Sequence, residues 1–248
     1  MAALFGSDAY SPREIAERVQ SVGVAKARLP LLSLVMLGML AGAVFSLGLL
    51  LVVVAGAELF TGNNLLAMAW ADGKLSSREL LVNWLLVCLS NFAGALGLAV
   101  LVLLSGHAEQ YSAIYLRILE VKTSLPAGKA FFSGVLCNVL VCMAVWMSLA
   151  GRSVVDKAVA VFFPISAFVA AGFEHSVSNM YFIPLGMMLQ AAAGQPVELL
   201  GLARNLVPVI AGNLVGGSVL VALVYYVIYR RPLRTASTLA PSRKASEG

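Results

Sequence analysis

Two ionisable residues, Glu174 and His175, stand next to each other in the middle of an apolar segment of the chain. Between residues 158 and 189 the only other ionisable side chain is that of Tyr181. An ionisable group at the centre of a bilayer costs roughly 2.5–3.5 kcal/mol on insertion scales, and chains keep one where it faces a partner, a cavity or a translocation path. The pair therefore predicts a path for a small charged solute, with His175 at its centre.

The composition indicates a polytopic membrane protein. Of 248 residues, 60% are hydrophobic and 12% are charged, and a soluble domain this apolar would aggregate. The net charge of +5 comes largely from the two tails, and basic flanks of membrane spans report topology, so we expect no nucleic-acid binding. The three cysteines lie in apolar segments without metal-ligand spacing, so we expect packing residues and neither a metal nor a cofactor.

Five apolar segments are each long enough to cross a bilayer, at about 30–57, 80–105, 129–150, 158–189 and 205–229. The fourth contains Pro164, Gly172 and Pro184 as well as the Glu-His pair, which predicts two half-helices joined by irregular backbone. Such backbone is tolerated at membrane depth only where it is buried in protein or lines a cavity.

Three regions follow from this pattern. Residues 1–29 are predicted to form an amphipathic surface helix, begun by a Ser11–Glu14 capping box with Pro12 at the first helical position. Residues 30–229 form the transmembrane domain. Residues 230–248 are a basic tail that we expect to be disordered and, from its charge, cytoplasmic. No signal peptide is expected, since acidic residues interrupt the first thirty positions.

The sequence repeats itself internally. The frame A-G-x-E-x-x-x-x-N begins at Ala55 and again at Ala171, 116 residues later. A second frame, Asn83 and Asn91, recurs as Asn205 and Asn213, 122 residues later. Repeats over about 30–105 and 129–229 predict an inverted pair whose broken helices meet at the midplane. Thr61 and His175 would then face each other, and the half-helix N-termini would favour an anion.

The first repeat is too short. In the second repeat, 129–171 supplies a full span and the first part of the broken helix, whereas Pro30 to Ala55 is about 39 Å of helix at 1.5 Å per residue. Both tails are basic and favour the cytoplasm, which requires an even number of crossings. We therefore expect that roughly fifteen to thirty residues are lacking, which fuses a truncated first span to the first broken helix. The alternative is an N-terminal tail outside.

From about Ser11 to Arg231 the chain resembles the formate–nitrite transporter family. The matching stretches are F-S-L-G-L at 45–49, A-E-L-F-T-G-N-N at 57–64, L-C-N-V-L-V-C at 136–142 and G-F-E-H-S at 172–176. The resemblance implies an all-α, aquaporin-like bundle of six spans in a bacterial inner membrane, assembled as a homopentamer. It also implies transport of small monovalent anions, formate first and nitrite next, and no enzymatic activity.

By motif position the resemblance implies the site residues. His175 would be the central pore histidine, Thr61 its partner, and Lys157 a cytoplasmic-side lysine that attracts the anion. Glu174 and Asn179 would complete the pore site. The apolar constrictions would be formed by Phe168, Leu49, Phe45, Phe60 and Leu59.

A mechanism follows as a hypothesis. Protonated His175 could donate a charge-assisted hydrogen bond to the anion, and passing on its proton would let the neutral acid cross the apolar rings. The alternative is a buried histidine whose ring nitrogens are hydrogen-bonded within the protein and which has no role in transport. Glu58 and Glu174 are themselves expected to be structural and to accept N–H groups of the facing loop.

Three rival functions stay open at this point. An intramembrane enzyme lacks support, because H-E-x-x-H is absent. A neutral-solute channel of aquaporin type would usually carry Asn-Pro-Ala motifs, which are also absent. The shortened first repeat makes an inactive truncated relative the third.

Overall fold

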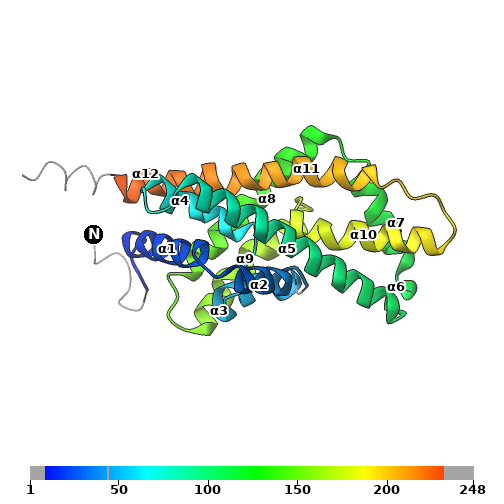
Figure 1. Cartoon of the computed structure of the whole chain (residues 1–248), viewed down its shortest axis with the longest axis horizontal. Helices are drawn as coiled ribbons and strands as arrows, with labels where there is room; N and C mark the ends of the chain where they lie inside the picture. Colours follow the sequence, from blue (N-terminus) through cyan, green and yellow to red (C-terminus); the bar gives the residue numbers. More distant parts are fainter. Residues whose placement is uncertain (1–8, 44, 232–248) are drawn as a thin grey trace, which may run out of the picture.

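The computed structural model describes residues 9–43 and 45–231, and within them all regular secondary structure is helical. The helices form an elongated bundle, with α1 and α12 at one end and α6 and α7 at the other (Figure 1). In chain order they are α1 (Pro12–Ala27), α2 (Leu31–Ala43), α3 (Phe45–Ala55), η2 (Gly62–Leu65), α4 (Leu66–Ala71), α5 (Ser77–Leu104), α6 (His107–Gln110), α7 (Ser112–Thr123), α8 (Ala127–Ser148), α9 (Val154–Ala170), α10 (Ser176–Ala192), α11 (Leu200–Leu214), the π-helical η3 (Val215–Leu223) and α12 (Val224–Tyr229).

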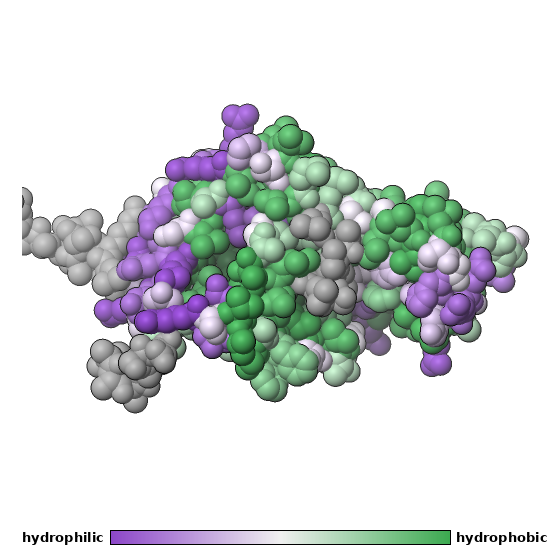
Figure 2. All heavy atoms as spheres, turned by 90° about the horizontal axis from the view of Figure 1, so that it is seen from below, coloured by the Kyte–Doolittle hydropathy of each residue, from purple (hydrophilic) through white to green (hydrophobic). Residues whose placement is uncertain are grey.

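The outer surface is that of a membrane protein. Among the described residues three continuous helical stretches are long and apolar enough to cross a bilayer: 77–104, 127–148 and 200–229. Figure 2 shows hydrophilic residues gathered at the two ends of the bundle and a hydrophobic band between them. The predicted all-α membrane bundle is confirmed, and so is the capping box in which Ser11 and Glu14 begin α1.

Both predicted broken helices are present. In the second repeat α9 ends at Ala170 and α10 begins at Ser176, and in the first α3 ends at Ala55 and η2 begins at Gly62. At each break a glycine of the repeated A-G pair takes a left-handed conformation, with φ +76° at Gly56 and +69° at Gly172. Residues with a Cβ rarely adopt this conformation. The glycines therefore stop both helices at equivalent places.

The first repeat is shortened, as expected, but in a different way. α2 packs along α5 as α8 packs along α11, so α2 is the counterpart of α8. Instead of one fused helix, the chain forms the two short helices α2 and α3. The N–H of Glu58 donates to the carbonyl of Leu37 (3.2 Å), so after α3 the chain has returned to the middle of α2. The reversal is needed to bring the first broken-helix loop to the centre of the bundle.

Residues 106–127 are polar in composition but do not form a loop, because the segment contains α6 and α7. Leu119 on α7 is buried against Ile183 and Met187 of α10. Arg117 and Glu120 of α7 are exposed, which explains why the segment resembles a loop in composition. His107 is exposed at the start of α6.

Two glycines at equivalent places in the two repeats allow close contacts between helices. A Cβ on Gly94 would collide with the backbone of Met39, and a Cβ on Gly216 would collide with the backbone of Val135. Backbone atoms cannot move aside as a flexible side chain can, and overpacking typically costs about 1–3 kcal/mol.

We therefore expect Gly216→Ala to lower the thermal unfolding midpoint of the detergent-solubilised protein by several degrees. The matched control is Gly97→Ala on α5, where an added Cβ meets nothing within 4 Å and where alanine is the better helix former. Equal unfolding midpoints for the two variants would contradict the packing argument.

Candidate functional site

The structure brings His175 and Thr61 into contact. Nε2 of His175 lies 3.0 Å from Oγ1 of Thr61, and Nδ1 accepts a hydrogen bond from the N–H of Ser178 (3.2 Å). An Nδ1 that accepts carries no proton, so the neutral ring has its N–H at Nε2 and donates to Thr61. Phe168 stacks on the imidazole, with ring centroids 5.6 Å apart. Thr61 and His175 are both buried, and His175 has only 2% of its surface exposed.

Two helix N-termini meet at this contact. Thr61 directly precedes η2, which continues into α4, and His175 is the N-cap residue of α10. The first N–H groups of a helix lack partners within the helix and give that end a partial positive charge. An anion between Thr61 and His175 would face the positive ends of both half-helices.

The carboxylate of Glu174 is held by other groups than expected. It accepts from Nζ of Lys122 (2.9 Å) and from the side-chain amides of Asn179 (2.6 Å) and Asn205 (3.2 Å). The expectation that it accepts N–H groups of the facing loop is wrong. A buried carboxylate needs a charge partner as well as hydrogen bonds, and Lys122 supplies both.

Glu58 has the equivalent surroundings in the first repeat. It accepts from Nζ of Lys26 (2.7 Å) and from the amide of Asn63 (2.6 Å), which in turn donates to Asn83 (3.0 Å). Each broken-helix loop is thus tied to a lysine near the end of a surface helix, α1 in one repeat and α7 in the other.

A further pair of asparagines holds the two loops in shape. Oδ1 of Asn91 accepts the N–H of Phe60 (2.8 Å), while its amide donates to the carbonyl of Glu58 (2.9 Å). Asn213 does the same in the second repeat, with the N–H of Ser176 (3.0 Å) and the carbonyl of Glu174 (3.1 Å). These amides replace hydrogen bonds that the interrupted helices cannot make.

The residue spacing between equivalent contacts shows how many residues shorter the first repeat is. Lys26 and Lys122 are 96 residues apart, and so are Gly38 and Gly134, whose carbonyls accept from Asn91 and Asn213. Glu58 and Glu174, in contrast, are 116 residues apart. The spacing changes between Gly38 and Glu58, so the first repeat has 20 residues fewer than the second in that interval.

A cavity of about 690 Å³ leads to the His175 ring and has mostly apolar walls. Leu49, Leu59 and Phe168 line it, as does Asn179. Phe60 is buried but is not one of its lining residues. The side chain of Phe45 lies outside the described part of the structure.

Lys157 is placed apart from the other predicted site residues. It is half-buried in the first turn of α9, at the opposite end of that helix from Phe168. It does not line the cavity that reaches His175. The structure therefore brings Thr61, His175, Glu174 and Asn179 together but leaves Lys157 outside the group.

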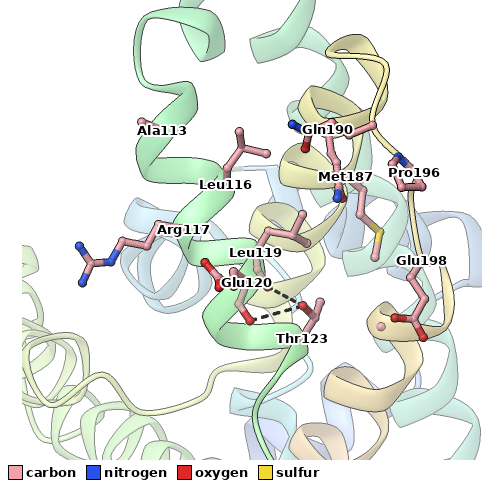
Figure 3. Close-up of a pocket in the computed structure, with 12 residues that line it drawn as sticks. Ala113, Leu116, Arg117, Leu119, Glu120, Thr123, Met187, Gln190, Pro196 and Glu198 are labelled. Carbon is pink, nitrogen blue, oxygen red and sulfur yellow. Dashed lines mark hydrogen bonds between the residues drawn. The ribbon is translucent and has the colours of Figure 1, made fainter.

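A second cavity, of about 770 Å³, lies at the far end of the bundle between α7, α10 and the loop before α11 (Figure 3). Glu120 and Glu198 are exposed in its wall, and the Arg117 side chain extends away from Met187. It contains none of the predicted site residues. We therefore do not assign it to the site.

Sequence reasoning missed Lys26 and Lys122. Both lie in polar segments outside the predicted spans, where a lysine is ordinarily solvated. Their spacing of 96 residues, shared with Gly38 and Gly134, was the available signal. Within the described residues, no group of His, Cys, Asp and Glu side chains could hold a metal ion.

Comparison with known proteins agrees with this geometry. The family model described as formate/nitrite transporter matches residues 39–227. The formate channel FocA of Escherichia coli K12 is 40% identical over 209 residues, covering 77% of this chain and 73% of FocA. A solved pentameric formate channel with formate bound superposes with a TM-score of 0.66 at 30% identity, covering 88% of this chain and 98% of that one.

An uncharacterised transporter of Bacillus subtilis, YrhG, bears on the short first repeat. The two sequences are 36% identical over an alignment of 261 residues, which covers 90% of this 248-residue chain and 95% of YrhG. The alignment is longer than the whole of this chain, so part of it consists of gaps in this chain. Within the aligned region, this chain is therefore the shorter of the two. The chain belongs to the formate/nitrite transporter family.

Proposed function

We propose that this chain conducts formate across a membrane by a path that passes between Thr61 and His175. The observation that carries the proposal is the 3.0 Å contact between these side chains, each at the N-terminal end of a half-helix. Two positive helix ends stabilise a monovalent anion where water is scarce. The channels named above, to which the chain is similar, are formate channels.

We further propose that His175 couples transport to protons. An anion that enters apolar walls must lose water, and this is costly unless a charged donor replaces it. The imidazolium form would supply a charge-assisted hydrogen bond, and transfer of its proton would yield neutral formic acid. Nitrite, also a small weak-acid anion, would use the same route.

The assembly and orientation of the protein are proposed on two grounds. The solved relative is described as pentameric, which supports a homopentamer here. α1, α12 and the loop that follows α4 meet at one end of the bundle, where Arg230 pairs with Glu17 and with Asp72. Basic ends usually face the cytoplasm, so both termini are assigned to the cytoplasmic side of a bacterial inner membrane.

A second candidate is an inactive relative that still inserts and assembles. The deficit of 20 residues between Gly38 and Glu58 favours it, because these residues would form part of one pore wall. Purified protein in liposomes separates the candidates. Uptake of labelled formate and of nitrite above that of protein-free vesicles, without glycerol permeation, supports the anion path. Equal uptake with and without protein supports the inactive relative.

The Thr61 hydroxyl should matter through its contact with His175. We expect Thr61→Val, which keeps the shape but removes the acceptor of the Nε2 hydrogen bond, to lower formate flux about tenfold, since the lost bond leaves a buried donor unpaired. Thr61→Ser keeps the hydroxyl and is expected to retain most of the flux. Initial rates in liposomes at equal protein content test this, and similar rates for the two variants would oppose it.

A further inference from the structure

Two cavities beside the proposed path have lining residues that are related by the internal repeat. One is the cavity of about 690 Å³, and the other is a cavity of about 30 Å³ on the side of α1. Equivalent residues line both: Lys122 and Lys26, Ile118 and Val22, Ser178 and Gly62, Asn179 and Asn63, Phe182 and Leu66, Phe168 and Val52. We call them the Lys122 mouth and the Lys26 mouth.

The two mouths differ greatly in size despite this equivalence. The volume of the Lys26 mouth is about that of one water molecule in the liquid. The Lys122 mouth is as large as sites that hold drug-sized ligands, roughly 300–1,000 Å³. Exposure agrees with the volumes. Ser178 and Phe182 are half-buried, while their counterparts Gly62 and Leu66 are buried.

The shortening of the first repeat accounts for the difference. Val145 and Leu149, from the last turns of α8 and just beyond it, line the Lys26 mouth. Their counterparts in the first repeat would come between Gly38 and Glu58, where 20 residues are lacking. The Lys122 mouth is therefore wide on the side where α2 ends early and α3 begins late.

From this asymmetry we infer that the Lys122 mouth binds organic monoanions that have an apolar body, of a size that the Lys26 mouth excludes. The inference rests on the proposed function and adds to it a ligand class larger than formate. Such an anion would bind reversibly and block the path.

The chemistry of the cavity fits this class of ligand. Its inner end holds His175, the N-terminus of α10 and the ammonium of Lys122. Within the described residues that ammonium donates to Glu174 alone, which leaves two N–H donors for an anion. The walls are apolar and include Phe162, which is 63% exposed on the outer face of α9. The charged group would lie inward and the hydrocarbon along the walls.

Flux inhibition provides the first test. Benzenesulfonate has an apolar ring and stays ionised at working pH, and methanesulfonate carries the same charged group without the ring. Each compound is added on both sides of the liposome membrane. We expect benzenesulfonate to inhibit formate flux at a concentration at least tenfold lower than methanesulfonate does. Ile118→Trp, which fills the Lys122 mouth, should weaken this inhibition, while Val22→Trp at the equivalent position of the Lys26 mouth should not. Equal inhibition by the two sulfonates would overturn the inference.

Thiol labelling provides a test that needs no transport. Ser178→Cys and Gly62→Cys place a thiol at equivalent positions of the two mouths, and the Gly62 site has room for a Cβ, 3.6 Å from Val145. We expect a sulfonated thiol reagent to modify Ser178→Cys at least tenfold faster than Gly62→Cys, and benzenesulfonate to slow only the former. The unsubstituted chain gives the background from Cys88, Cys137 and Cys142.

The two proposals can fail separately. A chain without formate flux, in which Ser178→Cys is still labelled rapidly and protected by benzenesulfonate, would refute the proposed function and support this inference. Equal labelling of both positions, or no protection, in a chain that does transport formate would refute the inference alone.

Discussion

Replacing His175 with glutamine is expected to lower formate flux at least tenfold and to abolish its dependence on pH between about 5 and 8. Glutamine retains hydrogen-bonding groups near Thr61 but cannot carry a proton, whereas an ordinary imidazole changes charge in this range. A buried donor without charge also loses the extra strength of a charge-assisted hydrogen bond to an anion. Initial rates of labelled formate uptake into liposomes, measured across that pH range, give both quantities.

The chain offers a matched control for this experiment. His107 is the other of the two histidines and is exposed at the start of α6, with its ring near Tyr111. His107→Gln should leave both the rate and the pH profile unchanged. If His175→Gln behaved like His107→Gln while remaining folded by size-exclusion chromatography, His175 would be a satisfied buried residue with no part in transport.

The positions of the broken helices could be predicted because local chemistry fixes them. Each break follows an A-G pair whose glycine takes a positive φ, and each is followed by a buried Glu and, five residues later, the Asn that donates to it. The same letters in both repeats therefore imply the same backbone. The meeting of Thr61 with His175 then follows from the inverted symmetry and needs no knowledge of long-range contacts.

The contacts of Lys26 and Lys122 could not be predicted in the same way. Each lysine lies on a surface helix, and composition alone places such residues in solvent. Only tertiary packing turns α7 so that Leu119 is buried and Lys122 reaches Glu174. The short first repeat was evident from its length, but its shape was not, because 25 residues can form one helix or a reversed pair. The need to return to the middle of α2 decides between them.

Lys122→Met is expected to destabilise the fold strongly, because it removes the charge partner of a buried carboxylate. The Lys122 and Glu174 side chains are only 17% and 6% exposed. Breaking such a pair typically costs about 3–5 kcal/mol, since the remaining charge is left uncompensated. We expect a clear loss of monodisperse protein in detergent and a thermal unfolding midpoint lower by ten degrees or more.

The second substitution in this cycle distinguishes a charge effect from a packing effect. Adding Glu174→Gln to Lys122→Met removes the unpaired charge but keeps an amide that Asn179 and Asn205 can reach, so most of the stability should return.

Lys157→Met, at a half-buried lysine in the first turn of α9, is the control for the loss of a lysine as such and should unfold near the wild-type temperature. If the double variant were as unstable as Lys122→Met, the lysine would stabilise the loop through packing of its methylene groups. Recovery would instead identify Glu174 as a carboxylate that stays ionised in the folded protein, and so as a fixed negative charge beside the path through which the anion is proposed to pass.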